Sequence, residues 1–369
     1  MAMPDTRMAF AVVSVALALI IGGCASGPVH EGADPQRSGW YGGRVFTDDP
    51  VELWRVDVEN PVVAGPILRG NQLLVATEGG ELLSLHRDSG ELQWRYRAEA
   101  GFRAAPAADR DHVYVGDING TVHAVSLDEG EAVWQVPGPG SITASALITD
   151  YGLVVANTAG QVQYLSRENG EMFWTHQADH SIHTPPSLHR DELVYVGTVG
   201  GQAIAIEMLS GEQRWEFDTG DAVYAGISLD DQWAYLASQD RSLTSLYVTE
   251  GIRRWDASTD GAINTTPALG HDRIHVGSHD GRLYAFAKDL GLPEWHTASG
   301  GDWVNAGPSV TRNAVIAGDH GGRVFAVDPD TGRTLWDWQA DGIVTGTPLP
   351  AGGRVYVTTQ GGSVVALSD

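Results

Sequence analysis

Histidine is the residue type in this sequence best suited to hold a metal or move a proton near neutral pH, and the chain has 13 of them. His271, His275 and His279 follow one another at a spacing that would place them on one side of a helix. In a strand, residues four apart are separated by about 13 Å, which is too far for a shared metal ion. The flanking residues favour strands and turns, so these histidines are predicted to lie in turns and on strand faces.

A second histidine group crosses a loop between two predicted strands. It consists of His176, His180 and His183, which could converge on one point. A metal site there would need further acidic or cysteine ligands. We therefore predict no metal site.

Carboxylates are abundant, but they recur at equivalent turn positions, as Asp88, Asp128 and Asp330 do. An aspartate in a turn accepts hydrogen bonds from local backbone N–H groups, which explains the recurrence better than a general acid/base pair. The sequence contains no nucleophile elbow, phosphate-binding glycine loop or zinc-ligand spacing. We predict no catalytic residue.

The first 24 residues have the pattern of a targeting segment. Arg7 precedes an apolar run, Ala9 to Ile21, that is too short to span a hydrocarbon core of about 30 Å. The run ends in Gly23-Cys24, which resembles the bacterial lipoprotein signal, in which the cysteine is lipidated and becomes the first residue of the mature chain. Cys24 is the only cysteine, so no intrachain disulfide can form. The alternative is an ordinary secretory signal with an incidental cysteine.

The prediction is therefore a signal peptide over residues 1–23, a flexible tether over 24–48 and a folded domain over 49–369. The tether is inferred from its Gly, Ser, Pro and Asp content and its lack of apolar periodicity. Ala25 follows Cys24. In Gram-negative lipoproteins an aspartate at this position favours the inner membrane, so alanine favours the outer membrane. The predicted location is extracytoplasmic: the periplasmic side of the outer membrane, or otherwise the outer face of the cell membrane.

Charge narrows the possible partners. The chain carries 47 acidic and 23 basic side chains, a net charge of −24. Such a surface repels nucleic-acid phosphates and anionic lipid headgroups. All basic residues except Lys288 are arginine. This bias suits a high-salt environment but also follows from a GC-rich genome.

A repeat of about 40 residues organises the chain. The recurring tryptophans are Trp54, Trp94, Trp134, Trp174, Trp215, Trp255, Trp295 and Trp336. A glycine stands four residues before each of the last seven. A period of this length is typical of propeller blades.

Each repeat reads as four short strands. In one unit, strands are predicted over 102–108, 112–116, 121–127 and 131–136, separated by polar turns. Seven complete units end on tryptophans, the C-terminal stretch supplies three further strands, and the stretch 51–58 supplies a lone fourth strand. We therefore predict an all-β, eight-bladed propeller of antiparallel blades, closed by the N-terminal strand joining the C-terminal blade. The alternative is seven blades with spare termini.

The stretch 326–336, Ala-Val-Asp-Pro-Asp-Thr-Gly-Arg-Thr-Leu-Trp, resembles the tryptophan-docking motif of the quinoprotein (PQQ-like) β-propeller repeat family, and 276–286 resembles the strand pair that precedes such a motif. The resemblance covers about residues 40–369 and implies that the eight tryptophans pack between neighbouring blades. Blade five departs from the pattern, because Ser238 to Ser242 contains no glycine at the expected turn.

Within this family, a lipoprotein signal followed by a single ring is similar to the BamB-like lipoproteins of outer-membrane β-barrel assembly. That resemblance implies a non-enzymatic, membrane-anchored scaffold that binds a protein partner, a barrel-assembly component if the cell is Gram-negative. The family also includes PQQ-dependent dehydrogenases. Blades of nearly uniform length, without a large insertion and with no vicinal cysteines, argue against that activity and against any cofactor. A small-ligand or PQQ-binding propeller, and a surface lipoprotein of an archaeon or halophile, remain alternatives.

The candidate binding face follows from alignment of the repeats on a recurring proline. Three residues earlier lies a variable set, whose neighbours one step before are all apolar, so the variable set should face away from the blade core. The variable positions are Val63, Arg103, Thr143, His183, Tyr224, Asn264, Asn305 and Thr345. The loops between second and third strands should share this face, and they hold Glu78, Asp117, Asp240, Asp280, Asp319 and His320, which form a predominantly acidic rim. We predict that the ring is monomeric. We predict that it contacts a protein partner through Arg103, His183, Tyr224, Asn264, Asn305 and Trp303.

Overall fold

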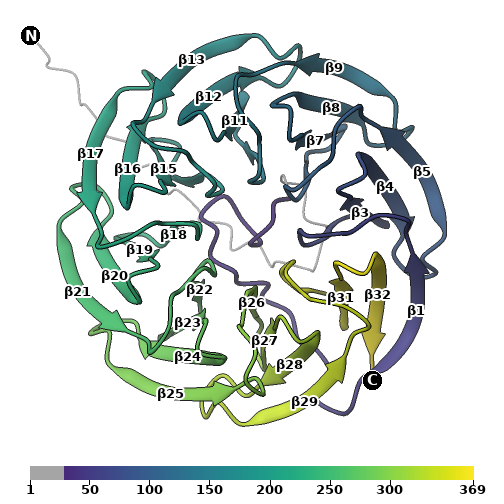
Figure 1. Ribbon diagram of the computed structural model, residues 1–369, viewed down its shortest axis with the longest axis vertical. Coiled ribbons are helices and arrows are strands. Elements are labelled where there is room, and N and C mark those ends of the chain that lie inside the picture. Colours follow the sequence, from purple (N-terminus) through teal and green to yellow (C-terminus); the bar gives the residue numbers. More distant parts are fainter. Residues whose placement is uncertain (1–28) are drawn as a thin grey trace, which may run out of the picture.

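The computed structural model describes residues 29–369, which form eight four-stranded antiparallel sheets arranged as blades around a central channel (Figure 1). Within this range the chain forms strands and turns and no helix. It follows that none of the described residues belongs to a helix able to cross a membrane. The prediction of an all-β, eight-bladed propeller is confirmed.

The strands follow chain order from the channel outwards in seven of the blades. Blades one to four consist of β2 (Ile67–Arg69), β3 (Gln72–Ala76), β4 (Glu81–His86), β5 (Leu92–Arg97); β6 (Ala107–Ala108), β7 (His112–Gly116), β8 (Val122–Ser126), β9 (Ala132–Val136); β10 (Leu147–Ile148), β11 (Gly152–Ala156), β12 (Gln161–Ser166), β13 (Met172–Gln177); and β14 (Ser187–His189), β15 (Leu193–Gly197), β16 (Gln202–Glu207), β17 (Gln213–Asp218). Blades five to seven consist of β18 (Ser228–Leu229), β19 (Trp233–Ala237), β20 (Ser242–Tyr247), β21 (Arg253–Ser258); β22 (Ala268–Leu269), β23 (Arg273–Gly277), β24 (Arg282–Ala287), β25 (Pro293–Ala298); and β26 (Ala306–Val310), β27 (Val315–Gly318), β28 (Arg323–Val327), β29 (Thr334–Gln339). Blade eight consists of β30 (Leu349–Ala351), β31 (Arg354–Thr358), β32 (Ser363–Ser368) and β1 (Val51–Asp57).

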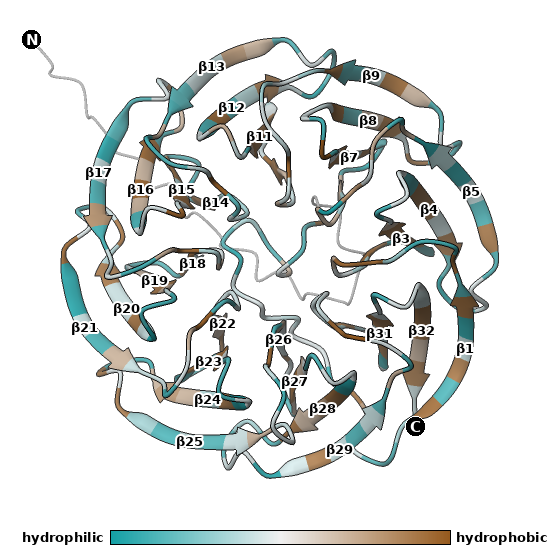
Figure 2. Cartoon of the chain, viewed as in Figure 1, coloured by the Kyte–Doolittle hydropathy of each residue, from teal (hydrophilic) through white to brown (hydrophobic). Residues whose placement is uncertain are grey.

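The innermost strands are shorter than the sequence predicts. In blade two the predicted strand 102–108 is reduced to β6, and Phe102 forms only an isolated bridge with Asp117. The three outer strands of that blade lie close to their predicted ranges. Figure 2 shows the middle strands of the blades as largely hydrophobic and the outermost strands as mixed, as expected for sheets stacked face to face around a ring.

The ring closes through β1. This strand pairs antiparallel with β32, from Val51 opposite Ser368 to Asp57 opposite Ser363. Trp54 and Val56 pack against the hydrophobic cluster between blades eight and one. The N-terminal strand thus covers the edge that β32 would otherwise expose.

Each repeated tryptophan lies between its own blade and the next one. Seven of the eight indole nitrogens donate to a backbone carbonyl across the interface; for Trp54 the acceptor is Arg87 O at 3.1 Å and for Trp94 it is Leu127 O at 2.8 Å. The exception is the buried Trp255 Nε1, which has no hydrogen-bond partner. A Cβ added to Gly90 would lie 2.7 Å from Trp54 Cε3, so the repeated glycine leaves room for the tryptophan of the preceding blade. The tryptophan repeat and the glycine repeat of the sequence therefore arise from the same contact between neighbouring blades.

Trp336, the last of the repeated tryptophans, docks against the segment before β1 and not against a turn of blade eight. Blade eight has no turn between its third and fourth strands, because β32 ends the chain and β1 begins the ring. Trp336 Nε1 instead donates to Phe46 O at 3.0 Å, and the two rings stack with centroids 5.0 Å apart. The residues just before β1 therefore replace the missing docking turn.

The blade-five turn contains no glycine, but its backbone adopts the left-handed conformation that glycine favours. Arg241 has a φ of 75°, close to the 80° of Gly281 at the equivalent position in blade six. A Cβ in this left-handed region costs about 1–2 kcal/mol. Arg241→Gly is expected to raise the free energy of unfolding by about 0.5–1 kcal/mol, because the added freedom of glycine in the unfolded chain offsets part of the relieved strain.

Urea denaturation measures this difference, and Arg241→Ala is the matched control. Alanine removes the same exposed side chain but keeps the Cβ, so it should give no gain. A glycine variant that is less stable than the wild type would contradict the strain argument.

The N-terminal plug, residues 29–46, corrects the tether prediction. This segment crosses the centre of the ring, as Figure 1 shows, and its backbone bonds to one inner strand after another. Leu188 N donates to Pro35 O at 2.8 Å, Leu229 N to Gln36 O at 3.0 Å, and Val310 N to Gly39 O at 2.8 Å. A sequence rich in Gly, Ser and Asp forms a fixed structure here because the exposed backbone groups of the inner strands pair with it.

Candidate functional site

The channel has two distinct ends. At one end, which we call the rim face, the loops joining second and third strands bond to the segment before each inner strand; Ile118 N donates to Gly101 O at 3.0 Å and His320 N to Trp303 O at 2.9 Å. At the other end, the plug face, lie the turns that join first to second and third to fourth strands. These turns are also tied together, since Leu127 N donates to Asp111 O at 2.9 Å.

The variable ring of the sequence lines the channel near the rim face. Its apolar neighbours, among them Val62, Phe102 and Ile263, have essentially no exposed surface. Seven of the eight variable positions line a cavity of about 210 Å³, and Tyr224 is the one that does not. The alternation read from the sequence is thus confirmed, and it places most of the ring around one space.

The plug forms the floor of this cavity, where the buried guanidinium of Arg37 bonds to backbone carbonyls. Arg37 Nε donates to Pro186 O at 3.2 Å, Nη2 lies 3.3 Å from Ser145 O and 3.2 Å from Ala146 O, and Nη1 donates to Glu31 O. Burial lowers the pKa of Arg37 to about 10, opposed by the carboxylates of Glu31 and Asp34, so the guanidinium stays charged at neutral pH. Burial raises the pKa of the Glu31 carboxyl, and Arg37 opposes that shift.

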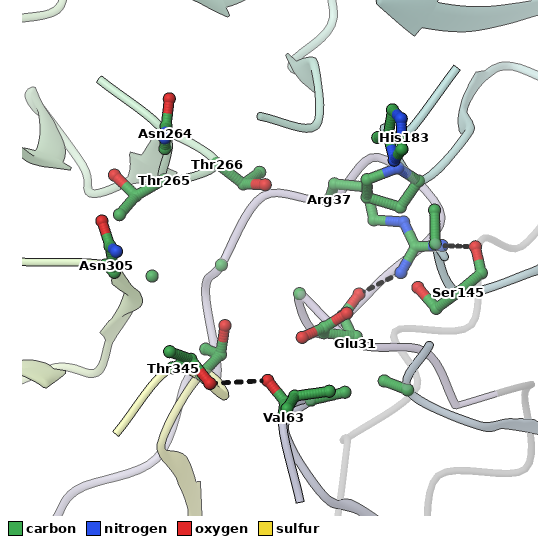
Figure 3. A pocket seen from close by; sticks show the side chains of 18 of the residues that line it. Glu31, Arg37, Val63, Ser145, His183, Asn264, Thr265, Thr266, Asn305 and Thr345 are labelled. Carbon is green, nitrogen blue, oxygen red and sulfur yellow. Dashed lines mark hydrogen bonds between the residues drawn. The ribbon is translucent and has the colours of Figure 1, made fainter. Parts of the chain in front are cut away.

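Figure 3 shows the resulting arrangement. Glu31 and Arg37 reach the cavity from the plug, while His183, Asn264, Asn305 and Thr345 surround it from separate blades. Thr345 Oγ1 donates to Val63 O at 2.9 Å, which links blade eight to blade one at this level. The chain's own N-terminal segment thus forms part of the cavity wall.

His30 makes the stability of the folded protein depend on pH. Ile148 N donates to His30 Nε2 at 2.9 Å, so the imidazole is neutral, and burial followed by the charge of Arg37 lowers its pKa to about 3. Between pH 6.5 and 3 the unfolded chain binds a proton at this site that the folded chain does not, so stability falls as pH falls through this window. At pH 4.5 the loss attributable to His30 is about 2–3 kcal/mol relative to pH 7.

His30→Gln keeps an acceptor for Ile148 N and removes the titration. Urea midpoints at pH 7 and 4.5 should therefore differ less for His30→Gln than for the wild type. His271→Gln is the matched control, because the His271 side chain is 95% exposed and the substitution should leave the pH profile unchanged. Equal acid sensitivity in the His30 variant and the wild type would refute this assignment.

Two of the predicted binding residues form a pair on the rim face. The His183 and Tyr224 rings lie 5.7 Å apart, and His183 Nδ1 is 2.9 Å from Thr143 Oγ1. Burial lowers the pKa of His183 below its usual value, so this imidazole is neutral at pH 7. Tyr224 remains exposed beside it and is not part of the cavity lining.

Trp303 is the centre of a second rim cluster. It stacks on His279, with centroids 4.5 Å apart and planes at 6°, and lies 5.6 Å from His320. Asn264 Nδ2 is 3.1 Å from His279 Nε2, which connects the cluster to the cavity. Burial lowers the pKa of His279. Almost half of the Trp303 surface, 48%, remains exposed, so the tryptophan presents a pre-ordered aromatic face to solvent.

Arg103 stands apart from these clusters and pairs with Glu78, with 2.8 Å between Nε and Oε1. The prediction of an exposed acidic rim is wrong for two of its five carboxylates. Asp117 is buried and accepts from Asn119 N and Thr121 N of its own turn, and Asp319 is buried as well and accepts from Arg323 N. These carboxylates stabilise the loops rather than the surface around the cavity.

The histidines singled out from the sequence do not gather. His271 lies in an exposed turn on the plug face, His275 is buried within β23, and His279 reaches the rim face. Over residues 29–369, no three His, Cys, Asp or Glu side chains come together in a way that would hold a metal ion. Cys24 lies outside the described residues.

The sequence did not identify the residues that close the pocket. Glu31 and Arg37 fall in a stretch with linker composition, and the only signal there is a pair of opposite charges six residues apart. What the arrangement offers chemically is a set of neutral imidazoles, amides and hydroxyls around a small cavity, flanked by exposed Tyr224 and Trp303. Such a surface suits recognition by hydrogen bonds and aromatic contact.

Comparison with known families gives one match. The family model described as outer membrane protein assembly factor BamB matches overlapping stretches over residues 46–181, 119–224, 158–302 and 279–369, which together cover the whole ring. No curated protein matches the sequence.

Solved structures share the fold at low sequence identity. BamB from Moraxella catarrhalis is 17% identical, with a TM-score of 0.76, covering 87% of this chain and 100% of that one. The computationally designed Ika8 protein is 16% identical, with a TM-score of 0.76 and coverage of 86% and 99%. Quinohemoprotein alcohol dehydrogenase from Comamonas testosteroni is 14% identical, with a TM-score of 0.78 and coverage of 91% and 79%. At these identities the likeness establishes the propeller fold and nothing finer.

Proposed function

Since the chain belongs to the family described as outer membrane protein assembly factor BamB, we propose that it is a lipid-anchored scaffold that binds a protein partner through its rim face. Cys24 carries the lipid, and the ring lies outside the cytoplasm, on the periplasmic side of the outer membrane if the cell is Gram-negative. The partner is then a component of outer-membrane β-barrel assembly. The scaffold binds this partner without turnover.

The observation that carries this proposal is the contrast between the two ends of the channel. Plug residues Glu31, Gly32, Arg37 and Gly39 line the pocket on one side, and the polar ring lines it near the rim face. Arg103, Tyr224 and Trp303 are exposed on that face, and arginine, tyrosine and tryptophan are the side chains that most often anchor protein interfaces. The stacked His279 holds Trp303 in place, which reduces the entropy lost on binding.

A small-ligand or PQQ-binding propeller is the second candidate, because quinohemoprotein alcohol dehydrogenases share the fold. The residues of this channel do not fit that group. Its free space, about 210 Å³, lies below the range of roughly 300–1,000 Å³ typical of cofactor pockets, since Glu31 and Arg37 occupy the inner part. Moreover, the one buried cation there is already bonded to backbone carbonyls and lies beside the Glu31 carboxylate.

The test is a triple substitution, Arg103→Ala with Tyr224→Ala and Trp303→Ala. Binding to the purified periplasmic part of the barrel-assembly component is expected to weaken more than 100-fold, because interface anchors of these types each contribute about 1–3 kcal/mol. The melting temperature should change little, since all three side chains are exposed.

The matched control replaces the exposed Arg110, Tyr151 and Phe173, which lie away from the rim face. This variant should bind the partner like the wild type. Unchanged binding by the rim variant would place the interface elsewhere on the ring. Reduction of a redox dye that depends on added PQQ and calcium would overturn the proposal of a binder without turnover.

A further inference from the structure

The plug fixes where the chain leaves the ring. Val29 forms an antiparallel bridge with Ala108 at the end of inner strand β6, with backbone hydrogen bonds of 2.7 and 3.0 Å. His30, the next residue, bonds to Ile148 on inner strand β10. The residue after Ala108 begins the turn to β7 on the plug face. Val29, the first described residue, therefore lies near the centre of the ring, at the plug face.

The distance from this exit to the proposed lipid anchor is short. Four residues, Ala25 to Pro28, separate Cys24 from Val29. Five Cα–Cα steps span at most about 18 Å when fully extended. To bring the rim face to the membrane, the chain would have to cross a blade and then the thickness of the ring. The first path is about 14 Å for three strand spacings and the second about 17–20 Å for a five- or six-residue strand, so the tether is too short.

From this geometry, and resting on the proposed anchor at Cys24, we infer that the plug face is a membrane-contacting surface and that the rim face points away from the lipid. The occupant of the plug face is the headgroup region of a bilayer. The tether is attached near the centre of the plug face and is shorter than the path around the edge of the ring. It therefore holds the plug face against the bilayer. The partner-binding rim face is then presented towards the aqueous side.

The side chains of the plug face agree with this assignment. Tyr151, in the turn between β10 and β11, is 81% exposed, and Leu209, in the turn between β16 and β17, is 96% exposed. The position of Leu209 carries aspartate in several other blades, such as Asp88 and Asp128. Leu290, in the turn between β24 and β25, is 61% exposed. Exposed leucine in place of a turn-forming aspartate suits a surface that meets lipid.

Tyr151 and Leu209 also border an apolar hollow. Its volume is about 360 Å³, and Phe173 and Met208 contribute to the lining. Many carboxylates occupy the remaining turns of the same face, so the lipid that fits is zwitterionic rather than anionic. Shallow contact through a few apolar side chains beside a lipid anchor is enough for stable attachment.

The experiment uses the full lipidated protein in phosphatidylcholine and phosphatidylethanolamine vesicles. Lipidation consumes the only native thiol, so one engineered cysteine can be labelled with an environment-sensitive fluorophore. Leu209→Cys and Leu290→Cys report on the plug face. Ile118→Cys, at an apolar position 41% exposed on the rim face, is the matched control. Nitroxide-labelled lipids should quench positions 209 and 290 at least two-fold more strongly than position 118.

A second variant tests the tether argument. Insertion of twenty Gly and Ser residues between Pro28 and Val29 should keep the protein on the vesicles but lower quenching at 209 and 290 towards the value at 118. Quenching at 118 equal to or above that at 209 in the native tether length overturns the inference. A protein that does not float with vesicles, as expected only for the Cys24→Ser control, refutes the anchor and the inference with it. Partner binding by the rim face is measured separately, so failure of the proposed interface remains distinguishable.

Discussion

A chain in which residues 51–58 are replaced by a Gly/Ser segment of equal length is expected to lose its closed ring and to aggregate. The replacement removes β1, and with it six backbone pairings to β32. It also removes Trp54 and Val56 from the cluster between blades eight and one. The two side chains alone contribute roughly 3–5 kcal/mol, a large fraction of the 5–15 kcal/mol that typically separates folded from unfolded domains.

Aggregation follows because β32 becomes an unpaired edge strand with a hydrophobic face. Size-exclusion chromatography and thermal unfolding measure both effects. A synthetic peptide covering residues 45–58 should restore the monomer by adding the missing strand in trans. Arg55→Ser is the control within the same strand, because its exposed ion pairs with Glu52 and Asp341 contribute less than about 1 kcal/mol. A monomeric replacement variant with an unchanged melting temperature would show that ring closure does not depend on β1.

The blades could be predicted from the sequence because two side-chain requirements recur in each of them. Trp54 needs a flat cavity in the next blade, and Gly90 provides it by having no Cβ. Because each blade must make this contact, tryptophan and glycine recur at a fixed spacing even where the rest of the repeat differs. Where blade five breaks the pattern at Arg241, the backbone still adopts the left-handed turn, so the fold tolerates one missing glycine at a local cost.

The plug could not be predicted, because most of its contacts with the ring are made by backbone atoms. Pro35, Gln36 and Gly39 each accept from an inner strand through a carbonyl oxygen. Any residue can supply a carbonyl, so composition alone indicates a linker. The docking of Phe46 against Trp336 could not be predicted either: the strand count implies that blade eight lacks a docking turn, but nothing in the sequence marks Phe46 as its replacement.

The candidate site was predicted in part. Alternation identified the positions that line the channel, since one face of the segment must enter the blade core while the other faces the channel. The polar environment was harder to read. Asp117 and Asp319 were assigned to an acidic rim, but each carboxylate turns back to bond its own loop. Side-chain direction in a turn depends on local hydrogen bonds that spacing does not reveal.

The plug connects the two functional proposals. It lines the channel pocket opposite the rim face, and it places Val29, the described residue nearest to the proposed lipid anchor, at the plug face. Both consequences depend on the segment staying in the channel. Among its side chains, the buried guanidinium of Arg37 bonds to backbone carbonyls at Glu31, Ser145, Ala146 and Pro186.

Arg37→Ala is therefore expected to destabilise the protein by about 3–5 kcal/mol, because hydrogen bonds from a charged group contribute about 1.5–3 kcal/mol each and a buried carbonyl without a donor costs about 1–3 kcal/mol. The substitution removes the positive charge that opposes the raised pKa of the Glu31 carboxyl, and it leaves backbone carbonyls of two blades without a donor. Urea denaturation measures the loss. If the plug detaches before the ring unfolds, trypsin should cleave after Arg44 faster than in the wild type, because that exposed residue is then no longer held between docked neighbours.

Two further variants separate the buried charge from simple loss of a long side chain. Arg44→Ala removes an exposed arginine from the same segment and should change the free energy of unfolding by less than about 0.5 kcal/mol. Adding Glu31→Gln to Arg37→Ala should recover part of the loss, because the double variant no longer buries an unpaired carboxylate. An Arg37→Ala protein that is as stable and as protease-resistant as the wild type would mean that the inner-strand hydrogen bonds alone hold the plug, and that the charge at the pocket floor serves the ligand-binding side of the cavity instead.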